Sequence, residues 1–114
     1  MQKKTYSIVG IEHTKKEDFV AALQAGKPVV LVREPNNKYD RNAVAVWIDG
    51  ERVGYIPRKQ NSVLAGFIDQ VGTPWEQPGM AQDGVTPTPA AVWDKSLPAK
   101  FVRSPNSGFP LVEL

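Results

Sequence analysis

The chain has 114 residues, of which 41% are hydrophobic and 23% are charged, so its composition is that of one globular domain with one core. It has no cysteine, which excludes disulfides and thiolate chemistry, and its lone histidine, His13, argues against a structural zinc site or a Ser-His-Asp triad. The net charge is +2, and the balance up to residue 70 is +3, which helps a polyanion to dock there.

No apolar run approaches the roughly 20 residues that span a bilayer. No small-residue cleavage site follows the N-terminal apolar stretch, so a secretory signal is not expected. We therefore expect a cytoplasmic protein that does not bind a membrane.

Two elements are expected before residue 28. Residues 4–9 alternate in polarity and predict a strand. Thr14 and Glu17 have the spacing of a capping box, and the apolar residues at 19, 20 and 23 then recur at helical spacing. Because Gly26 is a natural stop, the pattern predicts one helix over residues 15–25.

Residues 28–56 predict three strands. Pro28–Val32 and Ala43–Ile48 are almost wholly apolar and rich in β-branched side chains, as buried strands are. Asp49 and Gly50 form a strong hairpin signal, because glycine tolerates the positive φ of tight turns, and Arg52–Ile56 returns as the partner strand.

A second helix is expected after Pro57, because proline is tolerated in the first helical turn. It ends before Gly72 and carries an apolar stripe that we expect to face the core: Val63, Leu64, Phe67 and Ile68.

Residues 73–98 contain five prolines and no helical or strand period, so they predict a long loop or excursion. Trp75 and Trp93 lie within it, and a freely disordered segment rarely carries tryptophan, so part of it should pack back. Residues 100–103 and 110–114 are candidate closing strands.

The expected fold is mainly β with two helices (α+β), arranged as a small, partly closed β-barrel. Residues 1–72 form the core, residues 73–98 the proline-rich excursion, and residues 99–114 the closing strands of the same domain.

A polar loop, Glu34–Asn42, lies between the first two buried strands. Its ends are fixed by core packing, and loops held on a rigid scaffold commonly carry binding groups. It also contains turn formers that bond their own backbone, so composition alone favours a purely structural turn.

The residues of this loop and of the following hairpin resemble the HIRAN domain. The matching stretches are REPNNKYDRNAVAV over residues 33–46 and VGYIPR over residues 53–58. The resemblance implies an OB-like barrel with accessory helices that, in the best-understood members, binds single-stranded DNA at its 3′-hydroxyl end. No cofactor or metal is expected. Such domains occur fused to chromatin-remodelling helicases and as stand-alone bacterial or phage proteins.

The resemblance assigns a role to two neighbouring residues. Tyr39 matches the tyrosine on which a base stacks, and Asp40 matches the acid that meets the terminal sugar. A carboxylate repels phosphate but is a strong acceptor for a hydroxyl, so Asp40 suits a 3′-OH and opposes a 3′-phosphate. Asn42 either adds a hydrogen bond or braces the loop, and the turn preference of Asn favours bracing.

Other candidate DNA-binding residues are basic or aromatic. Tyr55 and Arg58 match a strand-to-helix position, where the guanidinium would join helix amides that favour phosphate. Lys59 is a weaker candidate for the same contact. Arg41 is a candidate backbone contact, as is Arg33, which could equally pair with Glu34 or another surface acid.

The opposing aromatic wall of the expected DNA site is not visible in this chain. Only His13 lies where DNA-end binders carry their first aromatics, and a solitary histidine is more often plain surface. Family members also supply a C-terminal aromatic, for which Trp75, Trp93, Phe101 and Phe109 are candidates.

The function expected is a binding module that holds single-stranded DNA for DNA repair or replication-fork processing, beside a helicase or nuclease encoded elsewhere. The alternative is a protein-interaction adaptor that uses residues 73–98 or an exposed strand edge. An enzyme is disfavoured because the acids Asp40, Asp49, Glu51 and Asp69 have no ligand spacing.

Overall fold

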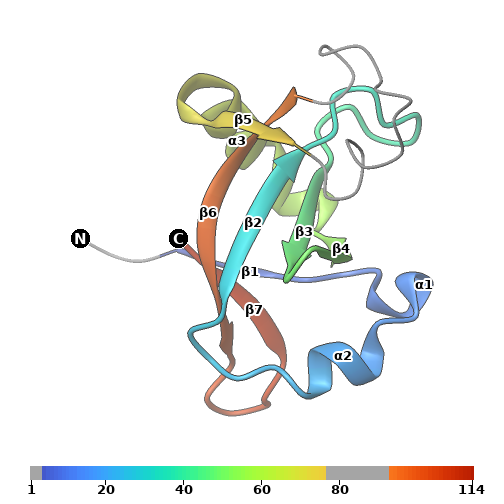
Figure 1. Ribbon diagram of the computed structural model, residues 1–114, viewed down its shortest axis with the longest axis vertical. Helices are drawn as coiled ribbons and strands as arrows, with labels where there is room; N and C mark the ends of the chain where they lie inside the picture. Colours follow the sequence, from blue (N-terminus) through green and yellow to red (C-terminus); the bar gives the residue numbers. More distant parts are fainter. Residues whose placement is uncertain (1–3, 77–92) are drawn as a thin grey trace.

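A computed structural model describes residues 4–76 and 93–114 of the chain (Figure 1). Its elements are β1 (Thr5–Ser7), α1 (Ile11–Thr14), α2 (Glu17–Ala21), β2 (Pro28–Arg33), β3 (Val44–Ile48), β4 (Glu51–Tyr55), α3 (Arg58–Val71), β5 (Thr73–Glu76), β6 (Trp93–Arg103) and β7 (Pro110–Glu113). None of the helices in these two ranges combines the length and apolar character that crossing a bilayer requires.

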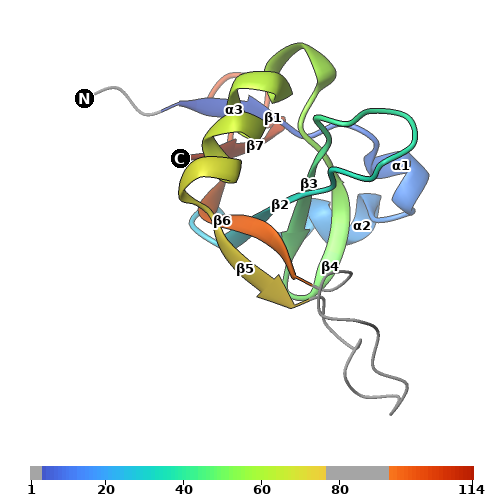
Figure 2. The same cartoon turned by 90° about the horizontal axis from the view of Figure 1, so that it is seen from above.

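The strands in the described residues form one antiparallel seven-stranded sheet that curls into a half-barrel (Figures 1 and 2). The order is β1-β7-β6-β2-β3-β4, with β5 pairing only with β6. Val9 and Tyr55 exchange two backbone hydrogen bonds, of 2.8 and 2.9 Å, which join the chain after β1 to β4. This seam brings the two ends of the sheet together, so the mainly β, OB-like fold predicted from the sequence is confirmed.

The core lies inside the curl and is built from alternate residues of the strands. Leu31, Val46, Val53 and Phe101 are fully buried there. Burial of each such side chain contributes about 1.5–3 kcal/mol, so the β-branched runs that predicted the strands also supply the core. The predicted turn is present too, since Asp49 and Gly50 have φ of 53° and 78°.

The helix predicted over residues 15–25 is present but shorter, since α2 spans only Glu17–Ala21. A separate helix that was not predicted, α1, precedes it at Ile11–Thr14, so the domain has three helices in its described part. Lys15 has a φ of 58° and ends α1. The Thr14 hydroxyl donates to the carbonyls of Ile11 (2.8 Å) and Val53 (3.0 Å). It therefore fastens α1 to β4, and the predicted capping box does not form.

The loop predicted over residues 73–98 is wrong at both ends, where β5 and the first part of β6 are strands. Pro74 is tolerated because β5 pairs on one side only. At Pro98, β6 pairs with β2 on one edge and has no strand partner on the other among the described residues. Proline is tolerated there because the unpaired edge needs no backbone N–H donor. Residues 77–92 of the predicted loop lie outside the described residues.

Helix α3 starts after Pro57 and ends before Gly72, as predicted, but its buried face differs from the predicted one. Leu64 and Ile68 are buried, whereas Val63 and Phe67 are 75% and 47% exposed. Asn61 and Ala65 are buried instead. Figure 2 looks down on α3 and on the loop between β2 and β3, which lie side by side at one end of the barrel.

Candidate nucleic-acid interface

The loop between β2 and β3 rests on a buried arginine. Arg33, only 6% exposed, donates from Nη1 to the carbonyls of Arg41 and Ala43, both at 3.0 Å. Its Nε and Nη2 donate to the carboxylate of Asp69 on α3 at 3.0 and 3.4 Å. Of the two roles considered for Arg33, the structure therefore supports pairing with an acid, and the guanidinium ties the loop to α3 from beneath.

Asn37 fixes the bend that carries the exposed residues. Its Oδ1 accepts from the backbone N–H groups of Tyr39 (2.9 Å) and Asp40 (3.1 Å), and its Nδ2 donates to Glu34 Oε1 (3.0 Å). The same Glu34 oxygen accepts from the Tyr55 hydroxyl at 2.9 Å. Burial and the neighbouring Glu34 carboxylate raise the pKa of Tyr55 to about 12. The Tyr55 hydroxyl therefore stays protonated at neutral pH and stabilises the loop through its hydrogen bond to Glu34.

Asp40 is held by the loop and by α3 together. Its Oδ1 accepts from the backbone N–H of Asn42 (2.9 Å), an Asx turn, and its Oδ2 accepts from Asn61 Nδ2 (2.7 Å). Arg58 Nε lies 3.5 Å from Oδ2. The hydrogen bonds from Asn61 and the Asn42 backbone, followed by the Arg58 charge, lower the pKa of Asp40, so the group is ionised at neutral pH.

Arg58 opens α3 and reaches back to the loop. Its Nη2 donates to the Tyr39 carbonyl at 2.6 Å, while its side chain stays 73% exposed. No side chain caps this end of α3, and its first turn contains no acidic residue. The helix start therefore presents positive charge beside Asp40 and suits an anion.

Five of the candidate residues line one pocket of about 510 Å³: His13, Tyr39, Asp40, Tyr55 and Arg58. Tyr39 is 78% exposed, so its ring is available to a ligand. His13 comes from α1, and its side chain is 83% exposed. The pocket also includes Asn61, Asn37, Val9, Ala43 and Ile56.

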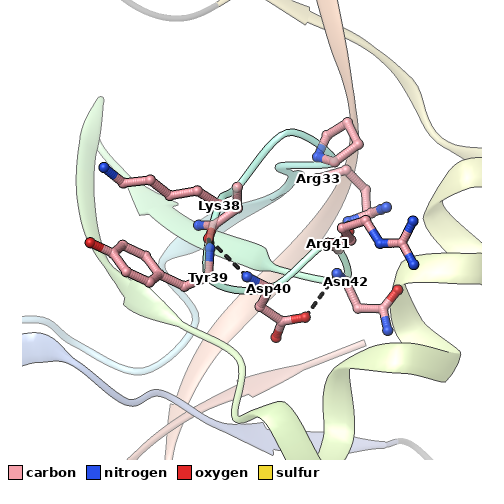
Figure 3. Close-up of a pocket in the computed structure, with 8 residues that line it drawn as sticks. Arg33, Lys38, Tyr39, Asp40, Arg41 and Asn42 are labelled. Atoms are coloured by element: carbon pink, nitrogen blue, oxygen red, sulfur yellow. Dashed lines mark hydrogen bonds between the residues drawn. The ribbon is translucent and has the colours of Figure 1, made fainter.

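The other candidates lie elsewhere. Arg41 and Asn42 line a second hollow of about 590 Å³ at the loop, together with Lys38 (Figure 3). Tyr39 and Asp40 line both hollows. The Asn42 backbone N–H braces Asp40, a bond that any residue except proline could make, so the role of the Asn42 side chain stays a prediction. Lys59 lines a separate hollow with Lys4 and lines neither of the two hollows around the loop.

A family model for the HIRAN domain matches residues 3–78, which is most of the chain. This chain belongs to the HIRAN family. HIRAN domains are in general DNA-binding modules.

Two known proteins are similar to this HIRAN domain. It is 33% identical to the helicase-like transcription factor of Oryctolagus cuniculus over 63 residues, which are 54% of this chain and 6% of the relative. The matched region is thus a small part of that relative. The crystal structure of a protein from Lactobacillus plantarum matches with a TM-score of 0.61 and 24% identity, covering 98% of this chain and 94% of that one, which supports the fold.

Three of the four candidate C-terminal aromatics have described side chains, and none of these three lines the pocket of this HIRAN domain. Phe101 is fully buried in the core, and the Trp75 ring packs against Trp47 with centroids 4.8 Å apart. Phe109 is exposed on the turn between β6 and β7, away from the pocket lining. The side chain of Trp93 lies outside the described residues.

Sequence reasoning missed Asn61, which holds Asp40, and the supporting role of Glu34. Asn61 lies one helical turn after Arg58 on a face that is otherwise apolar and buried. A polar residue on that face is the one signal that could have marked it, since buried amides require partners.

Proposed function

We propose that this HIRAN domain binds single-stranded DNA and holds its 3′-hydroxyl end in the pocket between the β2–β3 loop and α3. The observation that carries the proposal is one pocket lined by an exposed aromatic ring, an ionised carboxylate and an arginine at a helix start. Each group suits one part of a terminal nucleotide.

The base stacks on the ring of Tyr39, which is exposed to solvent. The ring is held in position because the Tyr39 backbone N–H donates to Asn37. Stacking on an exposed aromatic contributes about 1–3 kcal/mol per base without sequence preference. His13 lines the same pocket from α1.

The terminal 3′-hydroxyl donates to Asp40. A carboxylate has about four acceptor positions, and the hydrogen bonds from Asn42 and Asn61 occupy one on each oxygen, so acceptor capacity remains on Oδ1. A 3′-phosphate would meet the same negative charge and be repelled. Arg58 then contacts the phosphate that joins the terminal nucleotide to the one before it.

As a module of this kind, the chain acts in the cytoplasm without catalysis and places a DNA end for a helicase or nuclease carried on another chain, in DNA repair or at replication forks. The match to a helicase-like transcription factor supports this setting.

Fluorescence anisotropy with a labelled oligothymidylate of about ten nucleotides tests the proposal at low salt. We expect saturable binding of the 3′-hydroxyl strand, and binding of the 3′-phosphate strand that is weaker by about tenfold. A blunt duplex of the same length serves as a control and binds more weakly, because its terminal bases are stacked. Equal affinity for the two single strands would contradict end recognition.

A further inference from the structure

Helix α3 carries an apolar stripe that the domain leaves exposed. Val63, Phe67 and Val71 follow one another at intervals of four residues and are 75%, 47% and 50% exposed. Side chains at this spacing share one face of a helix. A single exposed apolar residue is ordinary, but a contiguous run on one helix face marks an interaction surface.

A groove of about 440 Å³ lies beside this stripe, at a gap in the barrel wall. Strand β6 pairs with β5 through residues 93–96 and with β7 through residues 100–103, so residues 97–99 have no strand neighbour on that edge among the described residues. Figure 2 shows α3 beside the C-terminal end of the chain. Residues from both line the groove. The groove is lined mainly by apolar side chains: Tyr6, Val63, Leu64, Phe67, Leu97, Pro98 and Leu114, with Lys4 at its edge.

The charged side chains around this groove are mainly basic. A hollow that shares Pro98 and Leu114 with the groove is lined by Lys100 and Glu113, and the other charged neighbours are lysines. Another hollow of about 300 Å³ shares Lys4, Tyr6 and Val63 with the groove and adds Lys59. Lys4 and Lys59 are the charged side chains that line the groove and this hollow, and neither forms an ion pair with any described residue. An apolar surface with unpaired cations at its rim is complementary to apolar side chains flanked by acids.

We propose that this groove is a docking site for a partner protein, and that the partner presents an amphipathic helix whose apolar face is flanked by Asp or Glu. The stripe from Val63 to Val71 is about 12 Å long, at 1.5 Å per residue, which matches two turns of such a helix. Apolar anchors at i, i+4 and i+7 would pack along Phe67 and into the groove, and acidic residues would meet Lys4 and Lys59.

The charge pattern distinguishes this partner from a second copy of the chain. A two-fold interface would place Lys4 and Lys59 of both copies against the same patch, where like charges repel. The groove residues are also distinct from those of the DNA pocket. The proposed docking site can therefore be tested independently of the proposed DNA binding.

A synthetic helical peptide of about 15 residues, with leucines at i, i+4 and i+7 and glutamates at the flanking positions, is the probe. A matched peptide has lysine at every glutamate position. By fluorescence anisotropy we expect the acidic peptide to bind at least about tenfold more tightly than the basic one. Phe67→Ala and the double variant Lys4→Glu, Lys59→Glu each weaken the acidic peptide by about tenfold or more.

Phe109→Ala is the matched control, because it removes an exposed phenylalanine that does not line the groove and should leave peptide binding unchanged. Thermal unfolding verifies that each variant is folded, and the lysine variants test the proposal even if Phe67→Ala is unstable. The proposal is overturned if the two peptides bind equally, or if neither binds at about 1 mM. It is also overturned if sedimentation shows a dimer that Phe67→Ala dissociates, or if single-stranded DNA displaces the acidic peptide.

Discussion

Tyr39 stands out at the scale of single residues, because 78% of its surface is exposed while the loop beneath it is rigidly bonded. An exposed ring contributes little to folding, so its position makes sense as a surface for a ligand. Lys38 Nζ lies 5.5 Å from the ring centroid, which places a further cation beside the base that would stack there.

Tyr39→Ala is expected to weaken single-stranded DNA binding by about 1–3 kcal/mol, or roughly 5- to 150-fold, because a stacking face is lost. Tyr39→Phe keeps the face and should bind within about twofold of the native protein. Both affinities can be measured by anisotropy, with unfolding midpoints as the control for stability. A Tyr39→Ala variant that binds as well as the native chain would rule out stacking on this ring.

Arg33 is expected to matter for stability. Arg33→Met removes the guanidinium that donates to the carbonyls of Arg41 and Ala43, of which the Ala43 carbonyl keeps the Glu34 N–H as a donor. This change should lower the free energy of unfolding by about 2–4 kcal/mol. Asp69→Asn is the matched control. Asp69 is half exposed, so losing its charge should cost less than about 1 kcal/mol. Urea unfolding of both variants measures the difference, and equal losses would show that the ion pair, not the carbonyl contacts, stabilises the loop.

Much of the loop was readable from the sequence, because Tyr39, Asp40 and Asn37 are close together in the chain. Its supports were not. Asn61 contacts Asp40 across 21 positions, and Arg33 contacts Asp69 across 36, so these pairs depend on how α3 lies against the barrel. Local patterns carry no information about such distant pairings.

At the scale of elements, strands were predicted better than helices. The runs that form β2 and β3 are apolar and largely β-branched, as strands buried on the inside of a barrel are. Strand β4 is more polar and was predicted from the Asp49–Gly50 turn that precedes it. The Thr14 to Glu17 pattern failed because the Thr14 hydroxyl finds a partner in β4, a contact that local spacing cannot show. The prediction that the whole apolar stripe on α3 faces the core is wrong, because Val63 and Phe67 are exposed to solvent.

The seam between Val9 and Tyr55 depends on Gly54. A Cβ at Gly54 would lie 2.5 Å from the Val9 carbonyl oxygen and 2.8 Å from Ile8 Cγ2, so Gly54→Ala must push the seam apart. We expect a loss of about 2 kcal/mol or more in unfolding free energy and faster amide exchange at Val9 and Tyr55.

Gly66→Ala is the control for this change, because a Cβ at Gly66 on α3 meets nothing within 4 Å. Alanine is the better helix former, so this variant should gain up to about 1 kcal/mol. Unfolding curves of the two variants, measured under the same conditions, give the difference in their free energies of unfolding. If Gly54→Ala were as stable as Gly66→Ala, close packing at the seam would not be what closes the barrel.

At the scale of the whole molecule, charge is modest and DNA binding should depend on few phosphate contacts. The net charge is only +2, and several cations are paired with acids, among them Lys16 with Glu51 and Lys27 with Asp49. A domain of this kind can recognise an end but gains little from long-range attraction to the backbone.

Salt dependence tests this view. The slope of log K against log salt should be about −1 to −2, since each phosphate contact on a single strand contributes about −0.7. Arg58→Gln should reduce the slope by about 0.7, whereas Lys59→Gln, which removes the same charge from the same helical turn, should change it less. Anisotropy titrations at several salt concentrations give the slopes. If the two substitutions reduced the slope equally, the phosphate would be attracted by the general positive charge at the start of α3 and not by a specific contact with Arg58.

The central claim is that Asp40 reads the DNA end, and a cycle of four affinities tests it most directly. The native chain and Asp40→Asn are each titrated with 3′-hydroxyl and 3′-phosphate strands of the same sequence. Asn is nearly isosteric with Asp. Its one oxygen still accepts from the Asn42 N–H, and its NH2 donates to the Asn61 oxygen once the Asn61 amide turns over, so the loop should stay folded. We predict that the native preference for the hydroxyl end, about tenfold, falls to about twofold or less in Asp40→Asn, with tighter binding of the phosphate strand beside Arg58. A preference of the same size in both proteins would contradict the account.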